Sequence, residues 1–236
     1  MIILAFDSTA KAASVAVCDG ERLLGLYNID NGLTHSELLL PMAENLLASL
    51  KLSFGDVELL AASVGPGSFT GVRIGVSLIK GIAFGRNIPC VSVSTLEALA
   101  ENASGLSGLI VPVMDARRAQ VYTATFRDGE RLCEDRATSI SELCAELSSV
   151  TDSDIYLTGD GYQSVYPALV KAGARVKPTP PLLIPESAYS VAKVAYRKHL
   201  GGESVTDLDI APTYLRMPQA ERERLERLNK ENNQGE

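Results

Sequence analysis

The strongest constraint on the fold of this chain is an internal repeat. The pentapeptide DGERL occurs at 19–23 and again at 128–132, which places the copies 109 residues apart. Each copy follows an apolar segment that ends in aspartate, MIILAFD at 1–7 and LIVPVMD at 109–115. Self-similarity of this kind is typical of a duplicated structural unit. We interpret each copy as a strand–turn–strand hairpin with an aspartate at the end of its first strand. Two unrelated hairpins that share a common turn sequence are the alternative.

The remaining pattern divides the chain into two lobes. Apolar runs with strand character alternate with stretches of helical period in both halves, which predicts an α/β fold. The small, polar segment ENASGLSG at 101–108 separates the halves. We therefore predict a duplicated two-lobe fold, in which each lobe is a mixed sheet with flanking helices. The N-terminal lobe would cover 1–103 and a smaller C-terminal lobe 104–216. The charged tail at 217–236 is expected to be frayed or disordered.

Composition indicates a globular protein and argues against several function classes. The 236 residues are 46% hydrophobic and 22% charged, an ordinary profile for a chain with a buried core. A net charge of −7 does not favour binding of nucleic acid by this chain alone. The start of the chain lacks the features of a signal peptide, no apolar run reaches membrane-spanning length, and the four cysteines lack CxxC spacing. We therefore expect a cytoplasmic protein with reduced thiols and no membrane association.

Both predicted hairpins carry oxygen-rich turns. The first strand ends in Asp7, Ser8 and Thr9, a carboxylate and two hydroxyls that suit Mg²⁺ or phosphate. The second ends in Asp115, which two arginines follow closely. Paired hairpins that present carboxylates to a central cleft are the plan of the actin-like (ASKHA) ATPases and sugar kinases. Aspartates also commonly end strands and cap turns, so the spacing alone leaves both interpretations open.

The stretch SVGPGSFTGVRIG at 63–75 has the glycine content of a phosphate loop but not its spacing. It matches neither the dinucleotide-binding pattern nor the P-loop pattern. Gly65 and Gly67 nevertheless form a turn before a helix start, which could still hold an anion. Gly71 and Gly75 lie one turn apart on one helix face. Because a glycine costs up to about 1 kcal/mol inside a helix, we expect another helix to pack closely against this face.

The helix predicted over 34–50 has an unusually wide apolar face. Its apolar residues from Leu38 to Leu50 span roughly 200° at about 100° per residue, whereas a surface helix needs a stripe somewhat wider than ~100°. The excess predicts burial on two sides, by its own lobe and by a partner. Complete burial within one large domain is the alternative. Together with the glycine-bearing helix predicted over 69–86, this helix is the predicted partner surface.

Several segments together resemble the TsaB family, also called YeaZ, of the bacterial tRNA threonylcarbamoyladenosine pathway. They are DST (7–9) with SVAV (14–17), HSELLLP (35–41), GPGSFTGVRIG (65–75), GIAFG with the later VSVSTLEALA (81–100), DARRAQVY (115–122), GDG (159–161) and PTYLR (212–216). The similarity covers nearly everything from Asp7 to Arg216, and the GPGSFTG block is highly specific.

The resemblance implies an actin-like fold and a subunit without catalysis of its own. In this family TsaB forms a heterodimer with the related catalytic subunit TsaD through the two helices after the opening hairpin, and a homodimer through the same surface when alone. With TsaD and the ATPase TsaE it supports threonylcarbamoyl transfer to the adenosine beside the tRNA anticodon, so tRNA is met only through the complex. The His-x-x-x-His metal pair of TsaD falls here on Thr95 and Leu99, which implies a pseudoenzyme with no metal site.

Two sets of site residues follow. The vestigial nucleotide-like cleft would contain Asp7, Ser8, Thr9, Gly65, Gly67 and Asp115; no cofactor is required, and weak binding of ATP, ADP or Mg²⁺ is left open. The partner interface would contain His35, Leu38, Leu39, Met42, Leu46, Phe69, Gly71, Arg73, Ile74, Gly75, Leu78 and Ile82. A small actin-like ATPase or kinase that uses Asp7 and Asp115 is the alternative function.

Overall fold

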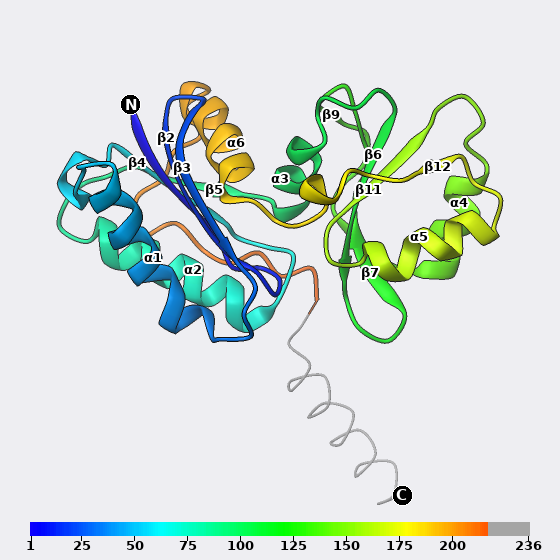
Figure 1. Cartoon of the computed structure of the whole chain (residues 1–236), viewed down its shortest axis with the longest axis horizontal. Coiled ribbons are helices and arrows are strands. Elements are labelled where there is room, and N and C mark those ends of the chain that lie inside the picture. The colour runs from blue at the N-terminus through cyan, green and yellow to red at the C-terminus, as the bar shows by residue number, and fades with distance from the viewer. Residues whose placement is uncertain (217–236) are drawn as a thin grey trace, which may run out of the picture.

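A computed structural model describes residues 1–216, which form two α/β lobes side by side (Figure 1). The N-terminal lobe is built on a five-stranded sheet in the order β3-β2-β1-β4-β5. Its strands are β1 (Ile2–Asp7), β2 (Ala13–Asp19), β3 (Arg22–Ile29), β4 (Leu59–Ser63) and β5 (Cys90–Val93). β1 pairs antiparallel with β2 and parallel with β4, so the opening hairpin continues into a parallel half-sheet.

Helices cover both faces of this first sheet. Helices α1 (His35–Ser49) and α2 (Phe69–Ala83) lie on one face, and α6 (Ala188–Leu200) lies on the other. Alternate side chains of β1 serve the two faces: Leu4 and Phe6 pack with α1 and α2, and Ile3 packs with α6. The middle strands are buried along nearly their whole length, which explains their continuous apolar sequence. A short 3₁₀ turn, η1 (Phe54–Asp56), links α1 to β4.

The C-terminal lobe repeats this sheet with the order β10-β7-β6-β11-β12. Its strands are β6 (Leu109–Asp115), β7 (Gln120–Thr123), β8 (Phe126–Arg127), β9 (Glu130–Arg131), β10 (Arg136–Ser139), β11 (Ile155–Thr158) and β12 (Val176–Lys177). Helices α4 (Ile140–Ser148) and α5 (Tyr162–Lys171) cover one face, and α3 (Thr95–Asn102) covers the other. A 3₁₀ turn, η2 (Pro181–Leu183), precedes the return to the first lobe.

The predicted duplication is confirmed at the level of topology. β6 pairs antiparallel with β7 and parallel with β11, as β1 does with β2 and β4. The first DGERL copy spans the β2–β3 turn and the second spans the β8–β9 turn. The second copy of the β2 strand is interrupted at Ala124 and Thr125, which divides it into β7 and β8. Asp7 and Asp115 are 108 residues apart and the two DGERL copies 109, so the second copy carries one extra residue in this interrupted stretch between strand and turn.

The predicted lobe bounds are corrected at two places. Helix α3, predicted within the N-terminal lobe 1–103, contributes most of its buried residues to the core of the second sheet. Residues 104–216 do not form one lobe, because α6 packs on the first sheet and the chain after it stays with the N-terminal lobe. Val205 forms a two-hydrogen-bond bridge with Cys90 at the edge of β5, with N···O distances of 2.8 and 2.9 Å. We call residues 205–216 the C-terminal strap. The prediction for 217–236 concerns residues outside the described range.

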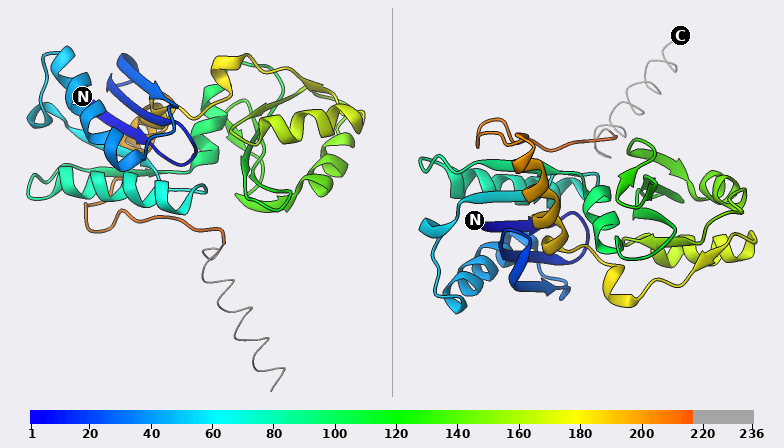
Figure 2. Two further views of the ribbon diagram at one scale, coloured as in Figure 1. Left: turned by 60° about the horizontal axis from the view of Figure 1, so that its bottom comes forward. Right: turned by 90° about the horizontal axis from the view of Figure 1, so that it is seen from above.

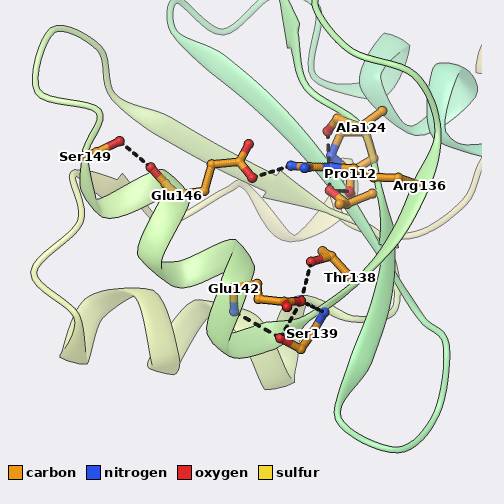
Figure 3. A network of polar contacts seen from close by, with 9 residues as sticks. Pro112, Ala124, Arg136, Thr138, Ser139, Glu142, Glu146 and Ser149 are labelled. Carbon is orange, nitrogen blue, oxygen red and sulfur yellow. Dashed lines mark hydrogen bonds and ion pairs between the residues drawn. The ribbon is translucent and has the colours of Figure 1, made fainter.

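The start of α4 shows how side chains fix a helix in the C-terminal lobe (Figure 3). Ser139 and Glu142 form a capping box, in which Ser139 Oγ accepts from Glu142 N at 3.1 Å and Glu142 Oε2 accepts from Ser139 N at 3.0 Å. Arg136 of β10 donates to Glu146 on the same helix at 2.5 Å. These contacts join α4 to the edge strand that precedes it.

No helix within residues 1–216 has the length and apolar character needed to span a bilayer.

Candidate functional site

The glycine loop after β4 packs onto the turn of the opening hairpin. Ser68 N donates to Thr9 O at 2.7 Å, and a Cβ on Gly67 would lie 2.6 Å from the same oxygen. Gly65 has a φ of +118°, which favours glycine, and a Cβ there would overlap the carbonyl oxygen of Thr213 in the C-terminal strap. These two glycines therefore let the loop fit between the hairpin turn and the strap. This is a packing requirement and needs no bound phosphate.

The glycine face of α2 also packs within the N-terminal lobe. A Cβ on Gly71 would overlap the carbonyl oxygen of Ser8, and one on Gly75 would lie 2.7 Å from Ser8 Oγ. Ser8 Oγ donates to Gly71 O at 2.8 Å. The predicted close approach is therefore present, but the approaching group is the hairpin turn of the same lobe. The prediction that another helix packs on these glycines is therefore wrong for Gly75 and holds only in part for Gly71, where the His35 side chain at the start of α1 lies 3.3 Å from the added Cβ. The later glycines of this region show no such contact, because Gly85 lies beyond the end of α2 and a Cβ on Gly81 would meet no neighbouring group.

Helices α1 and α2 leave a largely apolar groove of about 450 Å³ between them, which we call the α1–α2 groove. It is lined by His35, Ser36, Leu39, Leu40, Phe69, Thr70, Arg73, Ile74, Ser77 and Leu78. Leu40 is 40% exposed, Arg73 is exposed, and Ile74 and Leu78 are half-buried. Six of the predicted interface residues thus meet in one depression: His35, Leu39, Phe69, Arg73, Ile74 and Leu78. The sequence prediction missed Leu40, although its place in the wide apolar run from Leu38 to Leu50 was an available signal.

The other six predicted interface residues do not line the groove. Met42, Leu46 and Ile82 are buried in the core beneath the two helices, and Leu38 packs against the edge of that core. Leu46 Cδ1 occupies the space over Gly25, 2.6 Å from where a Cβ would stand on that residue. Gly71 and Gly75 are buried as well, whereas Leu38 is only half-buried. The wide apolar arc of α1 is therefore explained mainly by its own lobe, because Leu39, Met42, Leu46 and Leu47 are buried in the core that α1 shares with the first sheet and α2.

A second depression, which we call the interlobe cavity, lies between the lobes and has a volume of about 560 Å³. Its polar walls come from both hairpin turns, the start of α2 and the strap. The charged and aromatic lining residues are Lys11, Phe69, Asp115, Arg117, Tyr122, Asp160, Tyr214 and Arg216. Thr9, Gly67 and Asp115 line it as the sequence predicted, whereas Asp7, Ser8 and Gly65 do not. The last three lie behind the cavity wall, where they pack the hairpin turn and the glycine loop together.

The Asp7 side chain is buried within the N-terminal lobe and does not line the interlobe cavity. Its carboxylate is 1% exposed and accepts hydrogen bonds from Thr9 N at 2.9 Å, Thr9 Oγ1 at 2.7 Å and Ser63 Oγ at 2.5 Å. These bonds connect the ends of β1 and β4 to the hairpin turn. Burial raises the pKa of Asp7 above its ordinary value, although the hydrogen bonds from Ser63 and Thr9 act in the opposite direction.

The matching turn in the C-terminal lobe is strained and exposed. Arg117, Arg118 and Ala119 adopt φ values of 65°, 54° and 55°, three consecutive left-handed residues without a glycine. Such a conformation costs roughly 1–2 kcal/mol per residue. Asp115 Oδ1 accepts from Arg117 N at 2.8 Å, and its side chain pairs with the Arg117 guanidinium at 3.8 Å. The strained turn holds Arg117 at the cavity; the sequence placed two arginines at this turn, but no sequence pattern indicated its left-handed backbone.

Two further acidic residues act in this region, and the sequence analysis assigned neither to the site. Asp160 Oδ1 accepts from Asp115 N at 2.9 Å; burial raises the pKa of Asp160. Glu186, just before α6, is 3% exposed, and one of its carboxylate oxygens has no hydrogen-bond partner. Burial, together with the charges of Asp7 and Asp160, raises the pKa of Glu186 to about 8. The surroundings of Glu186 therefore favour its protonated, neutral form near pH 7, a property that only the three-dimensional structure produces.

The two positions onto which the resemblance places the His-x-x-x-His pair of TsaD are buried here. Thr95 and Leu99 lie one turn apart on α3 and are 0% and 1% exposed. Leu99 belongs to the cluster that joins α3 to the second sheet. Within residues 1–216, no group of three His, Cys, Asp or Glu side chains is arranged to hold a metal ion.

The comparisons with known proteins agree with this geometry. The family model described as TsaD, tRNA N6-adenosine threonylcarbamoyltransferase, matches residues 32–205. The chain is 32% identical over 222 residues to the tRNA threonylcarbamoyladenosine biosynthesis protein TsaB of Escherichia coli K12, covering 92% of this chain and 95% of that protein. YeaZ from Pseudomonas aeruginosa superposes with a TM-score of 0.72 at 26% identity, covering 91% and 99% of the two chains.

A more distant neighbour shows the wider fold. The ROK hexokinase from Thermus thermophilus aligns with a TM-score of 0.50 at 13% identity, over 86% of this chain and all of that one. Duplicated sheets of the same order on either side of a cavity define a member of the actin-like (ASKHA) fold class. Within that class the chain belongs to the TsaB (YeaZ) family of tRNA threonylcarbamoyladenosine biosynthesis proteins.

Proposed function

We propose that this chain is a scaffold and activator subunit that binds TsaD through the α1–α2 groove. With TsaE, the resulting complex supports threonylcarbamoyl transfer to the adenosine beside the tRNA anticodon, and this chain performs no catalysis of its own. The observation that carries the proposal is the groove, where Leu40, Ile74 and Leu78 present apolar surface to solvent. Exposed apolar surface in a groove between helices suits the apolar face of a partner helix.

Charge and family support TsaD as the occupant. Arg73 provides a cation at the groove, where an acidic residue of the partner can pair with it. TsaD is itself related to this chain, since its family model matches residues 32–205. When TsaD is absent, a second copy of this chain would cover the same groove and form a homodimer. A net charge of −7 fits a role in which tRNA is bound mainly by the partners, in the cytoplasm and away from membranes.

The alternative function, a small ATPase or kinase, draws on the interlobe cavity. Lys11 and Arg117 could meet phosphate oxygens there, beside the start of α2. Against it, the carboxylate of Asp7 is enclosed by hydrogen bonds from its own lobe, and Asp115 is paired with Arg117. We therefore propose that the cavity binds ATP, ADP or Mg²⁺ weakly at most and that the subunit requires no cofactor.

A binding experiment with a matched control tests the proposal. Ile74→Glu places a charge in the groove, whereas Val170→Glu places the same charge on α5, at a side chain that is 53% exposed in the other lobe. We expect Ile74→Glu to abolish both TsaD binding in calorimetry and homodimerisation on a sizing column, with Val170→Glu unchanged. Wild-type affinity in Ile74→Glu would exclude the groove as the partner surface.

A further inference from the structure

The C-terminal strap follows α2 and is anchored to the N-terminal lobe along its length (Figure 2). Lys80 Nζ on α2 donates to Leu208 O at 2.9 Å, Ile210 is fully buried, and Thr213 N donates to Val64 O at 2.7 Å. Together with the Val205 bridge to β5, these contacts fix where the strap ends. These contacts fix the backbone of the strap, which places Tyr214 at the first turn of α2.

Tyr214 packs on the first residue of α2. Its ring stacks on Phe69 with a centroid distance of 4.8 Å and an interplanar angle of 28°. The Arg73 guanidinium lies 5.2 Å from the centroid of the same Phe69 ring. Phe69 and Arg73 line the α1–α2 groove, whereas Tyr214 lines the interlobe cavity and lies outside the groove. Phe69 and Thr70 both line the two depressions, and it is Phe69 that contacts the strap, through its stack on Tyr214.

A half-exposed phenylalanine at a helix start has several accessible rotamers unless a neighbour restricts it. Ordering such a side chain on association costs roughly 0.5–1.5 kcal/mol. The Tyr214 ring restricts Phe69 before any partner arrives, and Arg73 over the ring is held with it. We propose that Tyr214 is a positioning residue of the partner surface, which orders Phe69 and Arg73 at the groove for TsaD; this rests on the proposed function.

The test compares Tyr214 variants in the full-length chain by calorimetric titration with TsaD from the same organism. Tyr214→Ala should weaken binding about threefold to tenfold, the range expected for loss of one aromatic pair. Tyr214→Phe keeps the stacked ring and should restore wild-type affinity. Leu208→Ala alters the same strap at a side chain that is 80% exposed and should bind like wild type. Thermal unfolding of each variant reports whether the fold is intact.

A double-mutant cycle separates positioning through Phe69 from a general structural effect. In a Phe69→Ala background, Tyr214→Ala should produce no further loss of affinity. Wild-type affinity in Tyr214→Ala, failure of Tyr214→Phe to rescue, or full additivity in the cycle would each overturn the inference. If Ile74→Glu loses binding while Tyr214→Ala keeps it, only this inference fails. If Ile74→Glu also binds like wild type, the proposed partner surface fails and the inference fails with it.

Discussion

Substitution of Gly71 by alanine tests whether the α2 glycines serve packing within the lobe or contact with a partner. The new methyl group would overlap the carbonyl oxygen of Ser8, a residue that is 1% exposed and enclosed between β1 and α2. Because the obstructing atom belongs to the backbone of a buried turn, the structure has little room to relax. Overpacking of this kind costs about 3 kcal/mol at the upper end of the observed range. Alanine also returns about 1 kcal/mol of helix propensity.

We therefore expect a net loss of about 2 kcal/mol in the free energy of unfolding of Gly71→Ala. For a chain of this size the loss corresponds to a melting temperature lower by about 4–8 °C. Gly81→Ala is the matched control on the same helix, because no atom lies within 4 Å of its added Cβ. It should gain roughly 0.5–1 kcal/mol through helix propensity alone.

Urea denaturation of the isolated protein measures both effects, and calorimetric titration with TsaD separates them from partner binding. The packing explanation requires that the folded fraction of Gly71→Ala, at a temperature below its transition, still binds TsaD. Undiminished stability combined with lost TsaD binding would refute the reasoning. It would return Gly71 to the partner surface that the sequence predicted.

Three further substitutions test the cavity, the buried acid and the C-terminal lobe. Asp7→Ala should lower the free energy of unfolding in urea titrations by about 1–3 kcal/mol for each donor left unpaired. ATP turnover, measured as phosphate release, should stay at background in both wild type and variant. The folded-state pKa of Glu186, about 8, lies above its ordinary value of 4.5, so the folded state retains a proton that the unfolded state releases. The contribution of the protonated Glu186 to stability is therefore complete below pH 4.5 and is lost as the pH rises towards 8. Glu186→Gln should gain stability relative to wild type as the pH rises across that window. A pH-independent difference in the free energy of unfolding between the two proteins would contradict the raised pKa. Ser139→Ala removes the α4 cap and should cost about 1 kcal/mol in thermal unfolding with TsaD affinity unchanged.

The sequence predicted the elements that depend on local chemistry and repetition. The two hairpins followed from the repeated DGERL segment, and the two-lobe actin-like plan followed from them. In the sequence, Thr34 with Glu37 and Ser139 with Glu142 have the spacing of a capping box, and the structure contains both at the starts of α1 and α4. These signals are reliable because each depends on residues close together in the chain.

The sequence could not show which neighbour receives each apolar or glycine face. Gly71 and Gly75 signal close packing, but the residue that lies nearest to both is Ser8, which is 63 residues before Gly71 in the chain. In the same way, no sequence pattern assigns α6 to the first sheet. This helix covers the apolar sheet face opposite α1 and α2, which would otherwise be exposed. The pKa of Glu186 is raised only in the folded chain, where the carboxyl is buried and the charges of Asp7 and Asp160 act on it.

The central claim is that this chain supports the modification by binding TsaD at the α1–α2 groove. The most direct measurement is the complete tRNA modification reaction with TsaD and TsaE, run without this chain, with wild type, with Ile74→Glu and with Val170→Glu. We expect threonylcarbamoyladenosine formation with wild type and Val170→Glu, and background levels without the chain or with Ile74→Glu. Full activity with Ile74→Glu, or product formed by this chain in the absence of TsaD, would contradict the claim.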